Sequence, residues 1–356
     1  MSNNIALVVG ASGISGANLA KQLITSGWKT YGLSRNPDQS TPGLIPVSAD
    51  LLNKESLEKA LQGINATHIY ITTWMRQQSE KENIRVNALM VRNLLDVLSS
   101  AKSIKHVALV TGLKHYLGPF EAYAKEGFLP ETPLRESQPR LAIDNFYYAQ
   151  EDEVYAAAKR EGFSWSIHRP HTVIGKAVGN AMNLGTTLAV YASICRETNI
   201  PFIWPGSSEQ WNGLSDVTDA RVLAKHLIWA SITESAKNEA FNITNGEVFR
   251  WKRLWFRLAD YFGIEAIGYN EEIKPLEIQM ANQEQIWKRI AQKYQLVEPD
   301  LNRLASAWHT DLDLSRPIEV MTDMTKSRKL GFTEYQYTED SFFELFDELR
   351  NSKLIP

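Results

Sequence analysis

Residues 5–16 read Ile-Ala-Leu-Val-Val-Gly-Ala-Ser-Gly-Ile-Ser-Gly, and this stretch decides the fold. The continuous apolar run Ile5–Val9 is typical of a strand that is buried on both faces of a parallel sheet. Three glycines, Gly10, Gly13 and Gly16, follow directly and open a segment with helical character. A strand, a glycine-rich turn and a helix in this order predict a Rossmann-type βα unit.

Short apolar runs alternate with amphipathic stretches through the first half of the chain. We expect further strands at Lys29–Ser34, Leu44–Ser48, His68–Thr72, His106–Val110 and Ser164–His168, and helices at Gly16–Ile24, Lys54–Leu61, Asn83–Ser99 and Asn145–Arg160. This alternation requires parallel strands joined by right-handed crossovers, and therefore predicts a doubly wound α/β sheet.

The pattern loosens after residue 170, and from Arg250 onward it is mostly helical, for example over Ser341–Leu349. We therefore predict a Rossmann core over residues 1–175, to which some later segments return. Residues 176–356 are expected to form a smaller, mostly helical substrate-binding part, without a flexible linker between the two.

The composition excludes several classes of function. A formal net charge of -3 over 356 residues gives no reason to expect nucleic acid or an anionic membrane as a partner. The single cysteine, Cys195, excludes an internal disulfide, and no cluster of His, Asp or Glu has metal-ligand spacing. Without a signal-peptide pattern or an apolar run near ~20 residues, we expect a cytoplasmic globular protein. The sequence leaves a homodimer open.

The glycine turn suits the pyrophosphate of a dinucleotide. Gly10 allows the tight turn, Gly13 lets the backbone approach the phosphates, and Gly16 lets the helix pack closely on the strand. The N-terminus of the helix then faces the phosphate charge. The spacing GxxGxxG is that of the extended short-chain dehydrogenase/reductases.

The end of the second strand bears on the choice between NAD and NADP. Proteins that select NAD place Asp or Glu here, to accept a hydrogen bond from the ribose 2′-hydroxyl. This chain instead has Ser34 and Arg35, a hydroxyl and a guanidinium that suit a 2′-phosphate, so NADP is expected. The alternative is that Arg35 is a solvated loop residue. Asp50, after the third strand, is expected near the adenine amino group.

The usual catalytic motif of short-chain reductases, Tyr-x-x-x-Lys on one helix, is absent from the expected helix. Four residues after Tyr147 stands Glu151, and four after Tyr148 stands Asp152. A cation is available at the end of the fifth strand, where Lys114 would meet Tyr147 from a different element, because the carboxyl ends of parallel strands open onto the ligand crevice. Neighbours on a helix lie ~100° apart, so Tyr148 is the rival of Tyr147 for that position.

Two longer blocks carry a more specific resemblance. Residues 111–121 read Thr-Gly-Leu-Lys-His-Tyr-Leu-Gly-Pro-Phe-Glu, and residues 145–152 read Asn-Phe-Tyr-Tyr-Ala-Gln-Glu-Asp. Together with Trp-Ser-Ile-His-Arg-Pro at 165–170, they closely resemble the progesterone 5β-reductase/iridoid synthase-like (PRISE) enone reductases, which are atypical extended short-chain dehydrogenase/reductases. The resemblance covers nearly the whole chain, up to the terminal Lys-Leu-Ile-Pro.

The resemblance implies an NADPH-dependent 1,4-reduction of a small hydrophobic enone or enal. A hydride would reach the β-carbon of the conjugated C=C bond, and negative charge would build on the carbonyl oxygen as an enolate. Tyr147 would hydrogen-bond this oxygen, and Lys114 would supply positive potential and orientation. The α-carbon would be protonated from solvent.

The resemblance also implies the cofactor contacts. They are Ser12, Gly13 and Ile14 at the pyrophosphate, Ser34 and Arg35 at the 2′-phosphate, Asp50 and Leu51 at the adenine, Thr73 and Trp74 after the fourth strand, and Pro170, Val173 and Met182 beside the nicotinamide. Phe120 is expected in the substrate pocket, because it follows the catalytic strand end.

Two other functions stay open. One is a carbonyl reductase or epimerase of the extended family, against which the missing Tyr-x-x-x-Lys motif argues. The other is a non-enzymatic NADP sensor, against which the presence of both Lys114 and Tyr147 argues. The histidines His115 and His168 are assigned to structural hydrogen bonds.

Overall fold

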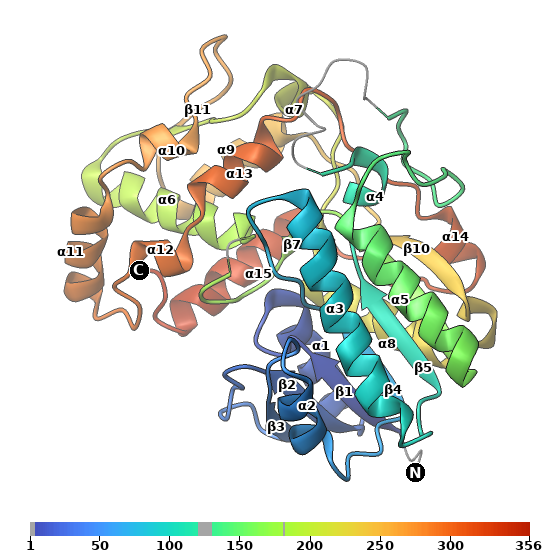
Figure 1. Ribbon diagram of the computed structural model, residues 1–356. Helices are drawn as coiled ribbons and strands as arrows, with labels where there is room; N and C mark the ends of the chain where they lie inside the picture. Colours follow the sequence, from blue (N-terminus) through green and yellow to red (C-terminus); the bar gives the residue numbers. More distant parts are fainter. Residues whose placement is uncertain (1–3, 120–129, 181) are drawn as a thin grey trace. The chain divides into compact units, whose positions relative to one another are not determined.

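The computed structural model describes residues 4–119, 130–180 and 182–356, and the chain forms two compact units (Figure 1). Unit 1 comprises Met1–His171, Ala220–Ile243 and Asp323–Glu334. Unit 2 comprises Thr172–Asp219, Thr244–Thr322 and Tyr335–Pro356. The chain thus returns to unit 1 twice after residue 171.

Unit 1 is built on a 7-stranded sheet with the strand order β10-β6-β5-β4-β1-β2-β3. The strands are β1 (Ile5–Val9), β2 (Lys29–Ser34), β3 (Leu44–Ser48), β4 (His68–Ile71), β5 (His106–Val110), β6 (Ser164–Pro170) and β10 (Glu239–Ile243). All neighbouring pairs are parallel, so the predicted doubly wound α/β sheet is confirmed. The strand order reverses between β1 and β4, and ligands of such sheets bind at the carboxyl ends of the strands there.

Helices cover both faces of this sheet. They are α1 (Ile14–Thr25), α2 (Lys54–Leu61), α3 (Glu80–Ser99), α4 (Lys114–Leu117), α5 (Phe146–Glu161), α8 (Ala220–Ile232), the 3₁₀ turn Glu234–Ala236 and α14 (Thr325–Lys329). The pair α3 and α5 packs side by side, and α1 packs against α8 (Figure 1). Leucine, isoleucine and valine side chains of the central strands fill the core beneath α3 and α5.

Caps explain where the helices begin. The Ser79 side chain accepts a hydrogen bond from the Glu82 N–H, so α3 starts at Glu80 rather than at the predicted Asn83. The Asn145 side chain caps α5 in the same way, and Gly162 ends α5 in a left-handed conformation.

Unit 2 is mostly helical. Its elements are β7 (Val173–Ile174), α6 (Leu184–Thr198), β8 (Phe202–Ile203), α7 (Ser208–Asn212), β9 (Thr218–Asp219), α9 (Trp251–Phe262), β11 (Ala266–Ile267), α10 (Leu276–Gln279), α11 (Glu284–Tyr294), α12 (Leu301–Leu304), α13 (Ala307–Leu314) and α15 (Thr338–Asn351). The short strands form two parallel pairs, β7 with β9 and β8 with β11.

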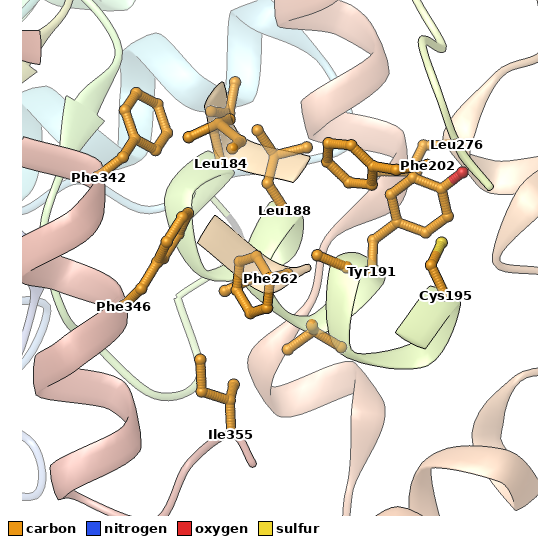
Figure 2. Packing of buried hydrophobic residues seen from close by; sticks show 14 of the residues in the cluster. Leu184, Leu188, Tyr191, Cys195, Phe202, Phe262, Leu276, Phe342, Phe346 and Ile355 are labelled. Carbon is orange, nitrogen blue, oxygen red and sulfur yellow. The ribbon is translucent and has the colours of Figure 1, made fainter. Parts of the chain in front are cut away.

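One apolar cluster holds unit 2 together. Figure 2 shows Leu184 and Leu188 of α6 in this cluster with Phe342 and Phe346 of α15. The Phe202 ring stacks on Trp255 with the ring centroids 3.9 Å apart. Large aromatic side chains dominate the burial energy of such a core. Among the described residues, no helix combines the length and the apolar character needed to cross a bilayer.

Candidate functional site

The turn after β1 requires glycine at two positions. Gly10 has a φ of 89°, which lies in the left-handed region that favours glycine. A Cβ atom on Gly16 would lie 2.2 Å from the Gly10 carbonyl oxygen, so no side chain fits there. The first turn of α1 therefore packs tightly at the end of β1, with Gly13 as its N-cap and no side-chain cap bond. Ser12 is exposed on this turn and Ile14 is buried below it. This cradle fits a dinucleotide pyrophosphate.

The ends of β2 and β3 bring together the residues predicted at the adenosine half of the cofactor. Ser34 ends β2, and its Oγ is buried without a hydrogen-bond partner among the described residues. Arg35 follows it and is exposed. Asp50 is exposed after β3, and the next residue, Leu51, is buried. A hydroxyl without a partner beside an exposed guanidinium fits a 2′-phosphate.

Thr73 and Trp74 follow β4, next to the glycine turn. A Cβ atom on Gly10 would lie 2.8 Å from the Thr73 Cβ, so Thr73 borders the cradle directly. The Trp74 ring stacks on Phe146, with the ring centroids 4.9 Å apart. Trp74 thereby connects the end of β4 to the first turn of α5.

Lys114 begins α4, just after the end of β5, and is 8% exposed. Its Nζ lies 4.9 Å from the ring centroid of Trp74, 5.0 Å from that of Phe146 and 5.9 Å from that of Tyr147. Aromatic faces attract a cation electrostatically, so these rings help to hold the ammonium group in a largely buried position. Lys114 and Tyr147, predicted from different elements, therefore do meet.

The Tyr147 hydroxyl lies against Gly112, two residues before Lys114. A Cβ atom on Gly112 would lie 3.4 Å from the Tyr147 Oη and 3.4 Å from the Pro170 carbonyl oxygen. Tyr147 itself is 6% exposed. The phenol thus sits at the carboxyl ends of β5 and β6, on the edge of the sheet that carries Lys114.

Tyr148, the rival of Tyr147, has its hydroxyl bound to backbone on both sides. Its O–H donates to the His115 carbonyl oxygen at 2.5 Å, and its oxygen accepts from the Leu141 N–H at 3.0 Å. Burial raises the pKa of the Tyr148 phenol. These contacts favour a structural role for Tyr148 and leave Tyr147 as the better candidate for contact with a substrate.

A buried carboxylate occupies the helix position where ordinary short-chain reductases have lysine. Glu151 is 1% exposed and pairs with Arg140 at 2.8 Å and with Arg169 at 3.7 Å. Its burial was not predicted, although the apolar residue Val154 three positions later marks the same buried helix face. A carboxylate held by arginines cannot supply the positive charge of the missing lysine.

His115 departs from the prediction of a structural hydrogen bond. Neither of its ring nitrogens has a hydrogen-bond partner among the described residues. Burial and the Arg169 guanidinium lower the pKa of His115 to about 3, so the ring is neutral. Its Nδ1 lies 4.0 Å from Glu151, but a neutral ring forms no ion pair there. Burial of the ring thus disfavours its charged form.

Three predicted site residues lie elsewhere. Val173 begins β7 and Met182 precedes α6, so both belong to unit 2 and their cofactor contacts stay predictions. Phe120 lies outside the described residues. Across the parts of the chain that are described, no group of three or more His, Cys, Asp or Glu could hold a metal ion.

Comparison with known proteins gives concordant results. The model of the PRISE-like Rossmann-fold domain family matches residues 46–356. The chain is 38% identical to (S)-8-oxocitronellyl enol synthase of Antirrhinum majus, covering 99% of this chain and 93% of that protein. It is 37% identical to 3-oxo-Delta(4,5)-steroid 5-beta-reductase of Arabidopsis thaliana, with the same coverage.

Solved structures agree on the fold. UDP-glucose 4-epimerase of Thermotoga maritima superposes with a TM-score of 0.67 at 13% identity, over 98% of this chain and 99% of that chain. A short-chain dehydrogenase/reductase superfamily protein of Agrobacterium tumefaciens, solved with NAD, also gives 0.67, at 16% identity over 99% of this chain and 98% of that chain. At such identities the likeness concerns the fold alone. The family match and the relatives over nearly the full length show that the chain belongs to the PRISE-like Rossmann-fold domain family.

Proposed function

We propose that this protein is an oxidoreductase that uses NADPH to reduce the activated C=C bond of small hydrophobic α,β-unsaturated ketones or aldehydes. The observation that carries the proposal is the meeting of Lys114 and Tyr147 at the end of β5, beside Gly112. Two relatives at 37–38% identity are named for a steroid 5-beta-reductase and an enol synthase, which supports the same chemistry.

The cofactor would be held by the glycine turn, the Ser34–Arg35 pair and Thr73. When bound, NADPH supplies the hydride for the β-carbon of the substrate. The Tyr147 hydroxyl donates a hydrogen bond to the substrate's carbonyl oxygen, which gains negative charge as an enolate. The Lys114 ammonium adds positive potential at the same edge, and the low exposure of both side chains strengthens this effect. Solvent then protonates the α-carbon.

The alternatives fit the site less well. A carbonyl reductase or epimerase of the ordinary kind needs a lysine four residues after the tyrosine, and Glu151 stands there in ion pairs with two arginines. A sensor without catalysis would not require a tyrosine and a lysine gathered at one strand end.

The assay follows NADPH oxidation with 2-cyclohexen-1-one and, separately, with cyclohexanone. We expect oxidation with the enone, cyclohexanone as its product, and no oxidation with the saturated ketone. Turnover of the ketone alone would identify a carbonyl reductase. Tight NADPH binding without turnover of a panel of small enones and enals would identify a sensor.

Arg35 should determine the preference for NADPH. Replacing it by glutamine removes a charge-assisted contact to the 2′-phosphate, worth about 1.5–3 kcal/mol. We therefore expect the Kd for NADPH to rise about 10–100-fold while the Kd for NADH changes little. Titration of both cofactors by fluorescence measures the two constants.

The control for this change is Arg85→Gln, at an exposed arginine on α3 that pairs with Glu82. It should leave both cofactor constants unchanged. If Arg35→Gln weakens the binding of NADPH and of NADH equally, or weakens the binding of neither, then Arg35 is a solvated loop residue and not the 2′-phosphate ligand.

A further inference from the structure

Asn145 joins the two segments that carry Lys114 and Tyr147. Its Oδ1 accepts a hydrogen bond from the Tyr147 N–H at 3.0 Å, which caps α5. Its Nδ2 donates to the carbonyl oxygen of Lys114 at 2.7 Å, 31 positions earlier in the chain. A single planar amide therefore contacts the backbone of both candidate catalytic residues.

The orientation of this amide is fixed by its partners. A backbone N–H can only donate and a carbonyl oxygen can only accept, so the amide cannot be flipped without losing both bonds. Asn145 is 3% exposed, which makes water a poor substitute for either partner. The amide thus sets the distance between the start of α4 and the start of α5.

The start of α5 has a second anchor that does not involve Asn145. The Phe146 N–H donates to the Glu80 carboxylate at the beginning of α3, at 2.7 Å. The carbonyl oxygen of Lys114 also accepts from the Gly118 N–H at 2.9 Å, a bond within its own short helix. Loss of the amide donor should therefore loosen α4 more than α5.

We propose that Asn145 is a positioning residue, which holds the Lys114 ammonium and the Tyr147 hydroxyl in register so that both act on one substrate oxygen. This inference rests on the proposed function, since it assigns the register to enone reduction. A misplacement of about 1 Å between catalytic groups can cost on the order of 10²-fold in rate.

Two substitutions at Asn145 separate its two bonds. Serine is about as good a helix cap as asparagine, so Asn145→Ser keeps the cap of α5. Its hydroxyl is one atom shorter and does not bridge to Lys114. Asn145→Ala removes both bonds. The matched control is Asn53→Ser, because Asn53 caps α2 through the Ser56 N–H at 2.9 Å and its amide bonds to no second helix among the described residues.

We expect Asn145→Ser to lower kcat for 2-cyclohexen-1-one about 10–100-fold, with KM for enone and NADPH within about twofold of the wild type. Its Tm should fall only slightly below that of Asn53→Ser, whose kcat stays unchanged, because the Lys114 carbonyl oxygen keeps its bond from the Gly118 N–H. Amide hydrogen exchange should become faster in residues 114–118 but not in residues 147–151. Asn145→Ala should lower both kcat and Tm.

An unchanged kcat in Asn145→Ser would overturn the proposal, as would an equal loss of kcat in Asn53→Ser or a Tm of Asn145→Ser far below that of Asn53→Ser. Amide exchange keeps the test independent of the proposed function. If the wild type reduces no enone, the proposed function fails on its own. Faster exchange confined to residues 114–118 then still supports the coupling by Asn145, and unchanged exchange there overturns it.

Discussion

Replacing Tyr147 by phenylalanine should lower kcat for enone reduction about 10²–10³-fold, the typical cost of removing one hydrogen-bond donor to a developing oxyanion. The hydroxyl at the end of β5 is the group that would meet the substrate's carbonyl oxygen, so its loss acts on the transition state more than on binding. KM should therefore change much less than kcat. Steady-state kinetics with NADPH and 2-cyclohexen-1-one measure both constants.

Tyr148→Phe is the matched control, one residue away on the same helix. Its hydroxyl binds the His115 carbonyl oxygen and the Leu141 N–H, so its loss leaves a buried carbonyl oxygen and a partly buried N–H without this partner. We expect a loss of about 1–3 kcal/mol in the free energy of unfolding, with kcat reduced less than tenfold. Equal losses of kcat in the two variants would refute the assignment of Tyr147 as the oxyanion donor.

Much of the fold is readable from local patterns. The bounds of β1, β2, β3 and β5 were predicted to the residue, because buried parallel strands are short apolar runs ended by polar or glycine-rich turns. The late segment β10 was not predicted as a strand of this sheet. Its pairing with β6 joins residues such as Ile243 and Pro170 far apart in sequence, and no local pattern encodes that distance.

In the site, too, some features could be predicted from the sequence and others could not. The meeting of Lys114 with Tyr147 was predictable, because parallel strands place their carboxyl ends on one edge of the sheet. The aromatic surroundings of Lys114 were not, since contacts with Trp74 and Phe146 depend on how α5 is rotated and on side-chain rotamers. The pair of bonds made by Asn145 could not be predicted either. Its cap position is a local property of the sequence, but its contact with α4 is not.

Unit 1 should unfold steeply on acidification, because hydrogen-bonded neutral histidines form a chain through its interior. The chain runs from the Lys105 carbonyl oxygen through Ser164, His106, Ser166, His168 and His226 to Ser327, with links of 2.8–3.0 Å. The Lys105 carbonyl oxygen can only accept, so the Ser164 hydroxyl donates to it. Each later group in the chain must then donate to the group before it. Each histidine then has one donating and one accepting nitrogen, and an added proton breaks a link.

The pKa shifts agree with this geometry. Burial lowers the pKa of His226 to about 3, and burial and the nearby His168 lower that of His106 to about 3. Burial and the nearby His226 lower the pKa of His168 well below its usual value. Two more buried histidines of unit 1 behave alike. His68 has a pKa lowered to about 4 by burial and Lys105, and His115 has a pKa of about 3.

The sign of the effect follows from linkage. The folded-state pKa of these histidines lies below the unfolded value of ~6.5. From about pH 6.5 down to about pH 3, the unfolded chain therefore binds more protons than the folded chain, and stability falls as the pH falls. Each histidine contributes about 1.4 kcal/mol per pH unit. The buried Glu136, whose pKa is raised by burial, acts in the opposite direction, because the folded chain then holds a proton that the unfolded chain has released. The histidines together should still give a loss of several kcal/mol per pH unit once the pH is well below 6.5.

Since whole domains are stable by roughly 5–15 kcal/mol, unit 1 should unfold above pH 4. Urea unfolding between pH 7.5 and 5, followed by circular dichroism and by amide exchange in β5 and β6, measures the slope. In His226→Gln the amide can still donate to His168 and accept from Ser327, but it does not titrate in this range. Its slope should be lower than that of the wild type by about one proton, or ~1.4 kcal/mol per pH unit. An identical slope in the two proteins would show that the histidine chain does not control acid stability, because the variant lacks the titrating imidazole of His226.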